Sequence, residues 1–315
     1  IERSVNNFDD NKLEYYAKKL GTTLEQLRAE IEQEEKEIDD LKHYFQEIEY
    51  SINVDSYDSF DDDYLDWFDL EKDHPLLGYW HYLKAKLYSR KKDSSSKKVK
   101  KLYLETVKTS KQYPGYEYLN IVSACYNSLS VVEFHERNYQ ESLRYLDQAI
   151  HYFFSNGDRR YLKHTLMANR AMCYLAMGRL SDAEKINEKL WEEFDQIEKI
   201  QTKAKVFYNE SIIKKAQKKY EDSRYLAWEC AELVHKNEMI EMGYFLYTHF
   251  GHLYTEAPYI VEHQPQRTEG CFRLALQLSK KLACLKPYKR AIISDAEKNM
   301  GLFYLSQGEY NKAEE

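Results

Sequence analysis

The chain has 315 residues and a net charge of −7, with 43% apolar and 31% charged side chains. Its ten glycines and five prolines are too few for a protein built from many hairpins, so the composition favours helices joined by few connections. The negative balance excludes the whole chain as a nucleic-acid-binding surface, which needs positive potential where it contacts phosphates. No stretch approaches the roughly 20 apolar residues of a membrane-spanning helix. The five cysteines never form a C-x-x-C pair, which predicts buried, reduced thiols in a cytoplasmic protein.

The first predicted elements are two helices within residues 9–27. Apolar side chains fall at the helical spacing i, i+3, i+4 and i+7, namely at Leu13, Tyr16, Ala17 and Leu20. Asp9 and Asp10 stand where this helix would be capped, and Gly21 stands where it would end. Thr23 is expected to cap the next helix, whose Leu24 and Leu27 would pack back on the first.

This stretch resembles the closing part of a Cro/repressor-type (Xre-type) helix-turn-helix domain, in which Ile1 and Glu2 would end the recognition helix. Ser4 and Phe8 replace the glycine and proline that are usual in that family. The resemblance implies that residues 1–23 are the carboxyl-terminal remnant of a DNA-binding domain, whose base-contacting segment lies before residue 1. An ordinary amphipathic helical hairpin is the alternative that the pattern alone leaves open.

Residues 24–74 are predicted to form a linker helix followed by an acidic segment. Apolar residues recur at helical spacing over residues 25–50, between glutamates that indicate a solvated face. Residues 55–73 mix aspartates with aromatic residues and predict either a docking patch or a loop whose aromatic side chains pack. A calcium loop fits less well, because the stretch lacks the glycine of the sharp turn. Residues 1–75 carry 23 acidic and 8 basic side chains, against 30 and 38 in the remainder.

From residue 75 onwards one motif recurs. It places an aromatic residue three positions after a small residue, with further small or apolar residues at offsets 7, 9 and 12. The small residues are Ala85, Ser130, Ala171, Ser211, Gly251 and Gly301, at spacings of 45, 41, 40, 40 and 50 residues. The motif resembles the tetratricopeptide repeat (TPR), in which a small residue lets two helices approach closely. We therefore predict an all-α, right-handed TPR-like helical solenoid over residues 75–315, with about six repeats, the last incomplete.

Polar residues recur just before the small residue of each repeat, on the helix that lines the concave groove of a TPR array. The predicted peptide-binding residues are Asn127, Asn169, Lys205, Tyr208, Asn209, His249 and Asn299. An asparagine ladder can donate to and accept from the main chain of an extended peptide, and Lys205 can bind a carboxylate. The alternative is that the asparagines face solvent or cap neighbouring turns. His249 and His252 are expected to pack rather than to bind zinc.

No nucleophile elbow, phosphate loop or metalloprotease motif occurs, so the sequence predicts a protein that is not an enzyme and uses no cofactor or metal. A helix-turn-helix head followed by a TPR-like array resembles the Gram-positive peptide-sensing (RRNPP, PlcR/NprR-like) transcriptional regulators. That resemblance implies a cytoplasmic quorum-sensing regulator that forms a homodimer through its array and binds a short signalling peptide, which controls DNA binding. The alternatives are a TPR protein that docks onto a phosphorelay response regulator and a generic TPR interaction scaffold.

Overall fold

The computed structural model describes residues 10–54, 70–91, 94–113, 115–257, 259, 265–285 and 291–314, and no strand occurs in these ranges. Two helices come first, α1 (Asp10–Leu20) and α2 (Leu24–Val54). The array then consists of α4 (Leu77–Tyr88), α5 (Ser96–Ser110), α6 (Ile121–His135), α7 (Tyr139–His151), α8 (Leu162–Ala176), α9 (Leu180–Glu192), α10 (Ile200–Ala216), α11 (Tyr220–Lys236), α12 (Ile240–Glu256), α13 (Pro265–Leu285), α14 (Ala291–Ser306) and α15 (Tyr310–Glu314). Short 3₁₀ turns, η2 (Glu117–Leu119) and η3 (Phe194–Gln196), lie between pairs.

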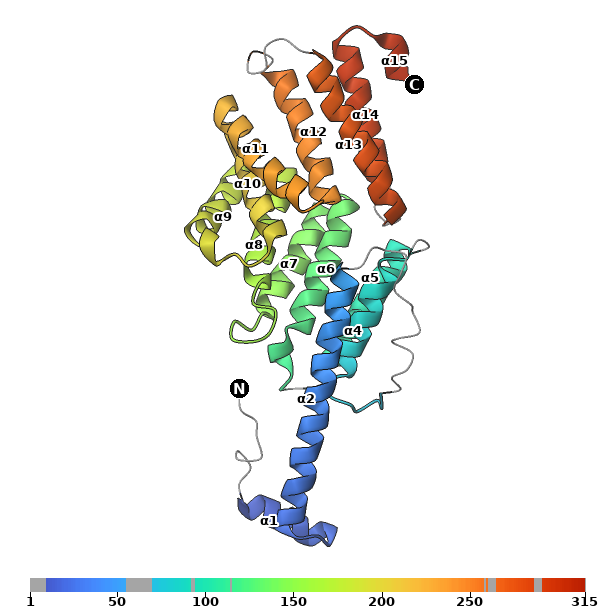
Figure 1. The fold of residues 1–315 in the computed structure, drawn as a ribbon, viewed down its shortest axis with the longest axis vertical. Coiled ribbons are helices and arrows are strands. Elements are labelled where there is room, and N and C mark those ends of the chain that lie inside the picture. Colours follow the sequence, from blue (N-terminus) through green and yellow to red (C-terminus); the bar gives the residue numbers. More distant parts are fainter. Residues whose placement is uncertain are drawn as a thin grey trace.

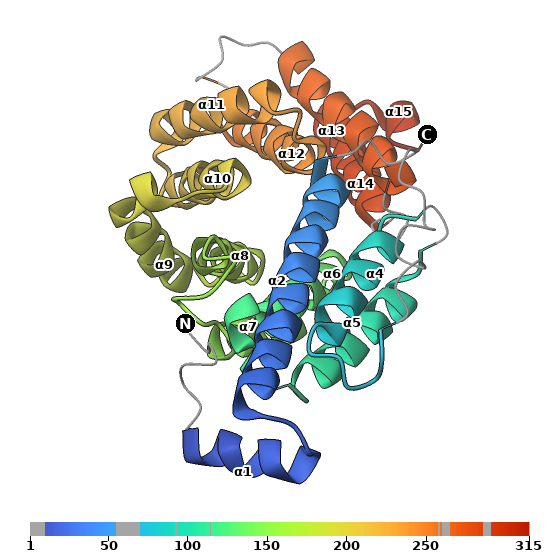
Figure 2. The same ribbon diagram turned by 60° about the horizontal axis from the view of Figure 1, so that its bottom comes forward.

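The helices of the array stack as successive antiparallel pairs that follow one another around a coil (Figure 1; Figure 2). The even-numbered helices from α6 to α14 form the inner layer, and the helix that follows each of them packs outside it. This arrangement confirms the predicted all-α solenoid. None of the helices in the described ranges is long and apolar enough to cross a bilayer.

The predicted small residues lie where paired helices approach closely. The carbonyl oxygen of Ser130 accepts a 2.8 Å hydrogen bond from Ser142 Oγ on the next helix. The carbonyl oxygen of Ser211 accepts in the same way from Ser223 Oγ, also at 2.8 Å. At Gly251 an added Cβ would lie 2.5 Å from an aromatic ring carbon of α13, which is closer than real Cβ contacts allow. The repeat spacing therefore reflects helix contact rather than chance.

The turns within the helix pairs contain a residue in the left-handed backbone conformation, with positive φ. Gly178 and Gly308 have φ values of 72° and 75°. Both are glycines of the repeat motif, so the sequence indicated these two turns. Arg137 and Lys218 take φ values of 63° and 60° at the corresponding turns of two other pairs. Non-glycine residues adopt this conformation at a cost, so the packing of the pairs imposes the turn even where the sequence lacks its usual signal.

The helices α1 and α2 form a hairpin with a reciprocal cap. Thr23 Oγ1 accepts from the Gln26 main-chain N–H at 3.1 Å, and Gln26 Oε1 accepts from the Thr23 N–H at 3.2 Å, as in a capping box. Leu13 and Ala17 are buried against Leu27. The other positions of the predicted apolar stripe are exposed, namely Tyr16 and Leu20. Residues 1–9 lie outside the described part of the chain, so the helix-turn-helix remnant stays a prediction.

The helix α2 extends over 31 residues, and only its carboxyl half packs on the array. Phe45, Ile48 and Ile52 are buried in the core that α2 shares with α4. The amino half and α1 project away from the array (Figure 1). The predicted linker helix thus joins the array to the amino-terminal hairpin. The acidic residues 55–69 lie outside the described part.

A buried ion cluster anchors α2. The carboxylate of Glu49 accepts hydrogen bonds from Lys86 Nζ at 3.0 Å, from Tyr79 Oη at 2.9 Å, and from Arg159 Nη2. Arg159 comes from the connection between α7 and α8, and its guanidinium also lies 4.6 Å from the ring centroid of Tyr79. Burial alone would raise the pKa of Glu49, but the charges of Arg159 and Lys86 and their hydrogen bonds lower it to about 2.

Replacing Glu49 with glutamine is expected to destabilise the protein by about 3–5 kcal/mol at pH 7, because the Arg159 guanidinium then lacks its buried counter-charge. The Glu49 pKa is lower in the folded chain, so its contribution is present above pH 4.5 and is lost as the pH falls towards 2. The difference from the wild type should therefore shrink across that window. Urea unfolding at pH 7 and pH 3 measures both effects.

Glu47→Gln is the matched control, since Glu47 is exposed on the same helix. If Glu49→Gln unfolds at the same urea concentration as Glu47→Gln at pH 7, the ion cluster does not anchor α2.

Candidate functional site

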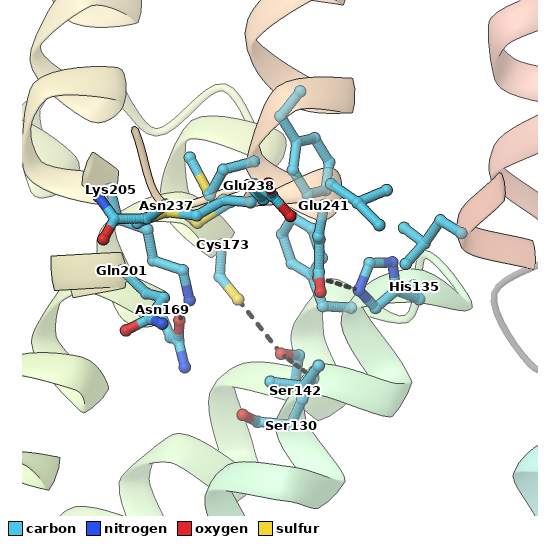
Figure 3. A pocket seen from close by; sticks show the side chains of 18 of the residues that line it. Ser130, His135, Ser142, Asn169, Cys173, Gln201, Lys205, Asn237, Glu238 and Glu241 are labelled. Atoms are coloured by element: carbon cyan, nitrogen blue, oxygen red, sulfur yellow. Dashed lines mark hydrogen bonds and ion pairs between the residues drawn. The ribbon is translucent and has the colours of Figure 1, made fainter. Parts of the chain in front are cut away.

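The coil encloses a cavity of about 440 Å³ (Figure 3). Its walls come from the inner helices α6, α8, α10 and α12, together with Asn53 at the end of α2, Ser142 of α7, the turn between α11 and α12, and Leu282 of α13. The labelled polar residues on these walls are Ser130, His135, Ser142, Asn169, Cys173, Gln201, Lys205, Asn237, Glu238 and Glu241. Four successive repeats therefore contribute to one polar site.

Three of the predicted peptide-binding residues form a hydrogen-bonded row across neighbouring inner helices. Asn169 Nδ2 on α8 donates to Asn127 Oδ1 on α6 at 2.8 Å. Lys205 Nζ on α10 donates to Asn169 Oδ1 at 2.6 Å. Asn169 and Lys205 both line the cavity. An ammonium group next to two amides suits a carboxylate or the carbonyl oxygens of a peptide.

Acidic groups lie on the other side of the same cavity. Glu241, in the first turn of α12, accepts from His135 at the end of α6, with 2.8 Å between Oε1 and Nε2. Figure 3 places Lys205 and Asn169 on one side of the cavity and His135 with Glu241 on the other. The site therefore carries charged groups of opposite sign on its two sides.

A second cavity of about 230 Å³ adjoins the first and is mainly apolar. It shares Phe134, His135, Met172 and Phe245 with the polar cavity. The residues that line only this second cavity include Tyr139, Leu175, Tyr208, Ile212, Tyr244 and Ile292, together with the ion pair of Arg137 and Asp295. Tyr208, one of the predicted peptide-binding residues, thus lies in the apolar part of the site.

Contacts between distant repeats contribute to the walls of the cavities. The rings of Phe134 on α6 and Phe245 on α12 meet edge to face, with 6.2 Å between their centroids. Arg137, in the turn after α6, pairs with Asp295 of α14. The carboxyl end of α6 therefore contacts the helices that begin about 100 and 150 residues later.

The remaining predicted residues lie elsewhere. Asn209 is fully buried and its Nδ2 donates to the carbonyl oxygen of Ala168 at 3.3 Å. His249 is also buried, with Nε2 2.6 Å from Ser211 Oγ. Asn299 is partly buried in α14 and lines neither cavity. Asn209 and His249 stabilise the packing between inner helices instead of facing a ligand.

The described residues contain no group of three His, Cys, Asp or Glu side chains that could hold a metal ion. Cys173 does line the polar cavity, and its Sγ lies 3.2 Å from Ser142 Oγ. Burial raises the pKa of the Cys173 thiol to about 11, so the thiol stays protonated and unreactive at neutral pH.

The sequence pattern did not indicate Phe134 and Phe245 as site residues. The motif expects an aromatic residue at position 133, but Glu133 stands there and pairs with Lys100 at 2.9 Å, while the aromatic ring follows one residue later. That displacement by one residue was the available signal, because the Phe134 ring contacts Phe245 of α12 as well as Tyr139 of its own partner helix.

The comparison with family models agrees with a repeat architecture. A tetratricopeptide repeat family model matches residues 122–151, which correspond to α6 and α7. Among solved structures, the crystal structure of BtubC (BKLC) from P. vanneervenii is similar at 18% identity and a TM-score of 0.47, over 70% of this chain and 88% of that chain. No curated protein matches the chain. The family match covers one helix pair of the stacked array, and TPR repeats generally mediate protein or peptide interactions.

The buried imidazole of His249 predicts a specific dependence of stability on pH. Burial lowers the His249 pKa from 6.5 to about 3. Between these pH values the unfolded chain binds the proton and the folded chain does not. The free energy of unfolding therefore falls with falling pH, by up to about 1.4 kcal/mol per pH unit. His249→Gln should flatten this dependence between pH 6.5 and 5, as measured by urea unfolding.

The exposed His43 provides the control, and His43→Gln should retain the slope of the wild type. An unchanged slope in His249→Gln would show that His249 is not held neutral by the fold.

Proposed function

We propose that this chain is the sensor part of a peptide-responsive transcriptional regulator, and that its TPR array binds a short signalling peptide in the polar cavity. The observation that carries the proposal is the hydrogen-bonded row of Asn127, Asn169 and Lys205, of which Asn169 and Lys205 line the polar cavity. Amides offer both a donor and an acceptor, so they match the alternating groups of a peptide main chain. The cavity also falls within the range of roughly 300–1,000 Å³ that is common for ligand sites.

The closure of the coil favours a short peptide over a folded partner. A receiver domain of a phosphorelay or another globular protein cannot enter a cavity of about 440 Å³ that the ends of α6 and α12 close. Such a partner would have to bind the outer surface, where the asparagine row does not lie. A short extended chain matches the size and the polarity of the cavity.

The helix α2 supplies a route from the cavity to the amino-terminal hairpin. Asn53 near its carboxyl end lines the polar cavity, and the same helix runs without interruption to Leu24 beside α1. A peptide that contacts Asn53 can therefore favour one orientation of α2. The regulator hypothesis places the DNA-binding head beyond α1 and a homodimer contact on the array, so this helix would transmit the signal.

Synthetic peptides of five to eight residues, taken from short reading frames beside the gene, test the proposal by thermal unfolding. A cognate peptide at a hundred times its Kd should stabilise the protein by about 2.7 kcal/mol. Asn169→Ala should weaken binding about tenfold or more, because it removes a buried amide that pairs with the peptide.

Asn299→Ala is the matched control, since Asn299 occupies the same repeat position in α14 but lines neither cavity. Failure of every peptide to shift the unfolding temperature would contradict peptide binding. Equal effects of the two substitutions would contradict the assignment of the site to the polar cavity.

A further inference from the structure

One face of α10 leads from the polar cavity into the apolar one. Gln201, Lys205, Tyr208 and Ile212 follow each other at i, i+4, i+7 and i+11, which places them on one side of the helix. Gln201 and Lys205 line the polar cavity, and Tyr208 and Ile212 line the apolar one. The whole stripe spans about 16 Å at the helical rise of 1.5 Å per residue. A ligand bound at Lys205 therefore has apolar surface within reach.

Aromatic rings from three inner helices form the boundary between the two cavities. Phe245 of α12 lies between Tyr208 of α10 and Phe134 of α6, with ring centroids 6.1 Å and 6.2 Å from its own. An apolar cavity of about 150 Å³ is already large enough to take up a molecule of the size of benzene. The apolar cavity here measures about 230 Å³ and can take a leucine, isoleucine or phenylalanine side chain.

We propose that the apolar cavity is a specificity subsite of the peptide site, which takes one bulky apolar side chain while the carboxyl terminus of the peptide lies on Lys205. This inference rests on the proposed function. It defines the ligand as a short peptide with a free carboxyl terminus and a bulky apolar residue near that end.

The geometry of α10 fixes which residue of the peptide enters the subsite. Lys205 and Tyr208 are three residues apart, so their side chains are neighbours about 5–6 Å apart at Cβ. An extended peptide advances about 3.3 Å per residue. The apolar side chain therefore belongs to the last or the penultimate residue of the peptide. The side chain of a peptide residue farther from the carboxylate would lie beyond the rings of Phe134, Tyr208 and Phe245.

A randomised library of acetylated pentapeptides with free carboxyl termini provides the probe. Peptides retained by the protein after ultrafiltration are sequenced by mass spectrometry. Leucine, isoleucine or phenylalanine should be enriched at one of the last two positions. The enrichment of leucine over alanine should be roughly 50-fold, from about 0.8 kcal/mol for each buried carbon. The same library with amidated carboxyl termini should be retained poorly.

Two substitutions fill the subsite. Ile212→Trp places a larger side chain on the α10 wall of the subsite. Ala176→Trp does the same at the exposed end of α8, where a larger side chain leaves the core intact. Both should abolish the apolar preference. Ile150→Trp, at an exposed position that lines neither cavity, is the control and should retain it. Lys205→Gln should keep the apolar preference but lose the discrimination between free and amidated termini.

The outcomes separate this inference from the proposed function. Retained peptides without an apolar preference, or a preference that survives both tryptophan substitutions, would overturn the subsite and leave peptide binding intact. Equal retention of free and amidated peptides would overturn the role of Lys205. Retention of no peptide by a folded protein would overturn both the subsite and the proposed function.

Discussion

His135 at the end of α6 lies buried against Glu241 in the first turn of α12, and the two residues are 106 positions apart in the chain. The rings of Phe134 and Phe245 and the pair of Arg137 with Asp295 extend this contact to α14. A TPR array ordinarily presents an open concave surface, because each repeat contacts its neighbours alone. Here the coil returns to its own earlier repeats, and the groove becomes two adjoining cavities. The size and polarity of the ligand, and its access to the cavities, all follow from this contact between distant repeats.

The long helix α2 connects that closed interior to the amino-terminal end of the chain. Its anchor is the buried carboxylate of Glu49, held by Arg159 and Lys86 from two different parts of the array. Its carboxyl end reaches the polar cavity through Asn53. A bound ligand can shift the position of such a helix only by binding its alternative positions with different affinities. Contact with Asn53 is the structural feature that provides this difference in the proposed regulator.

The helix pairs could be predicted from the sequence because each repeat carries its own packing requirement. Residues such as Ser130 and Gly251 are small because a neighbouring helix touches them, and this constraint is visible in every repeat separately. The closure could not be predicted in the same way, since it depends on small rotations that accumulate over several repeats. Asn169 and Asn209 illustrate the difference. They occupy the same position of successive repeats, yet Asn169 lines the cavity and Asn209 is fully buried against α8.

The most direct test of the account is a crystal structure of the protein with the peptide that binds most tightly. The account predicts that the peptide lies inside the closed coil, with its main chain on Asn169 and its carboxylate on Lys205. A peptide bound on the outer surface, with the interior of the coil unchanged, would contradict it.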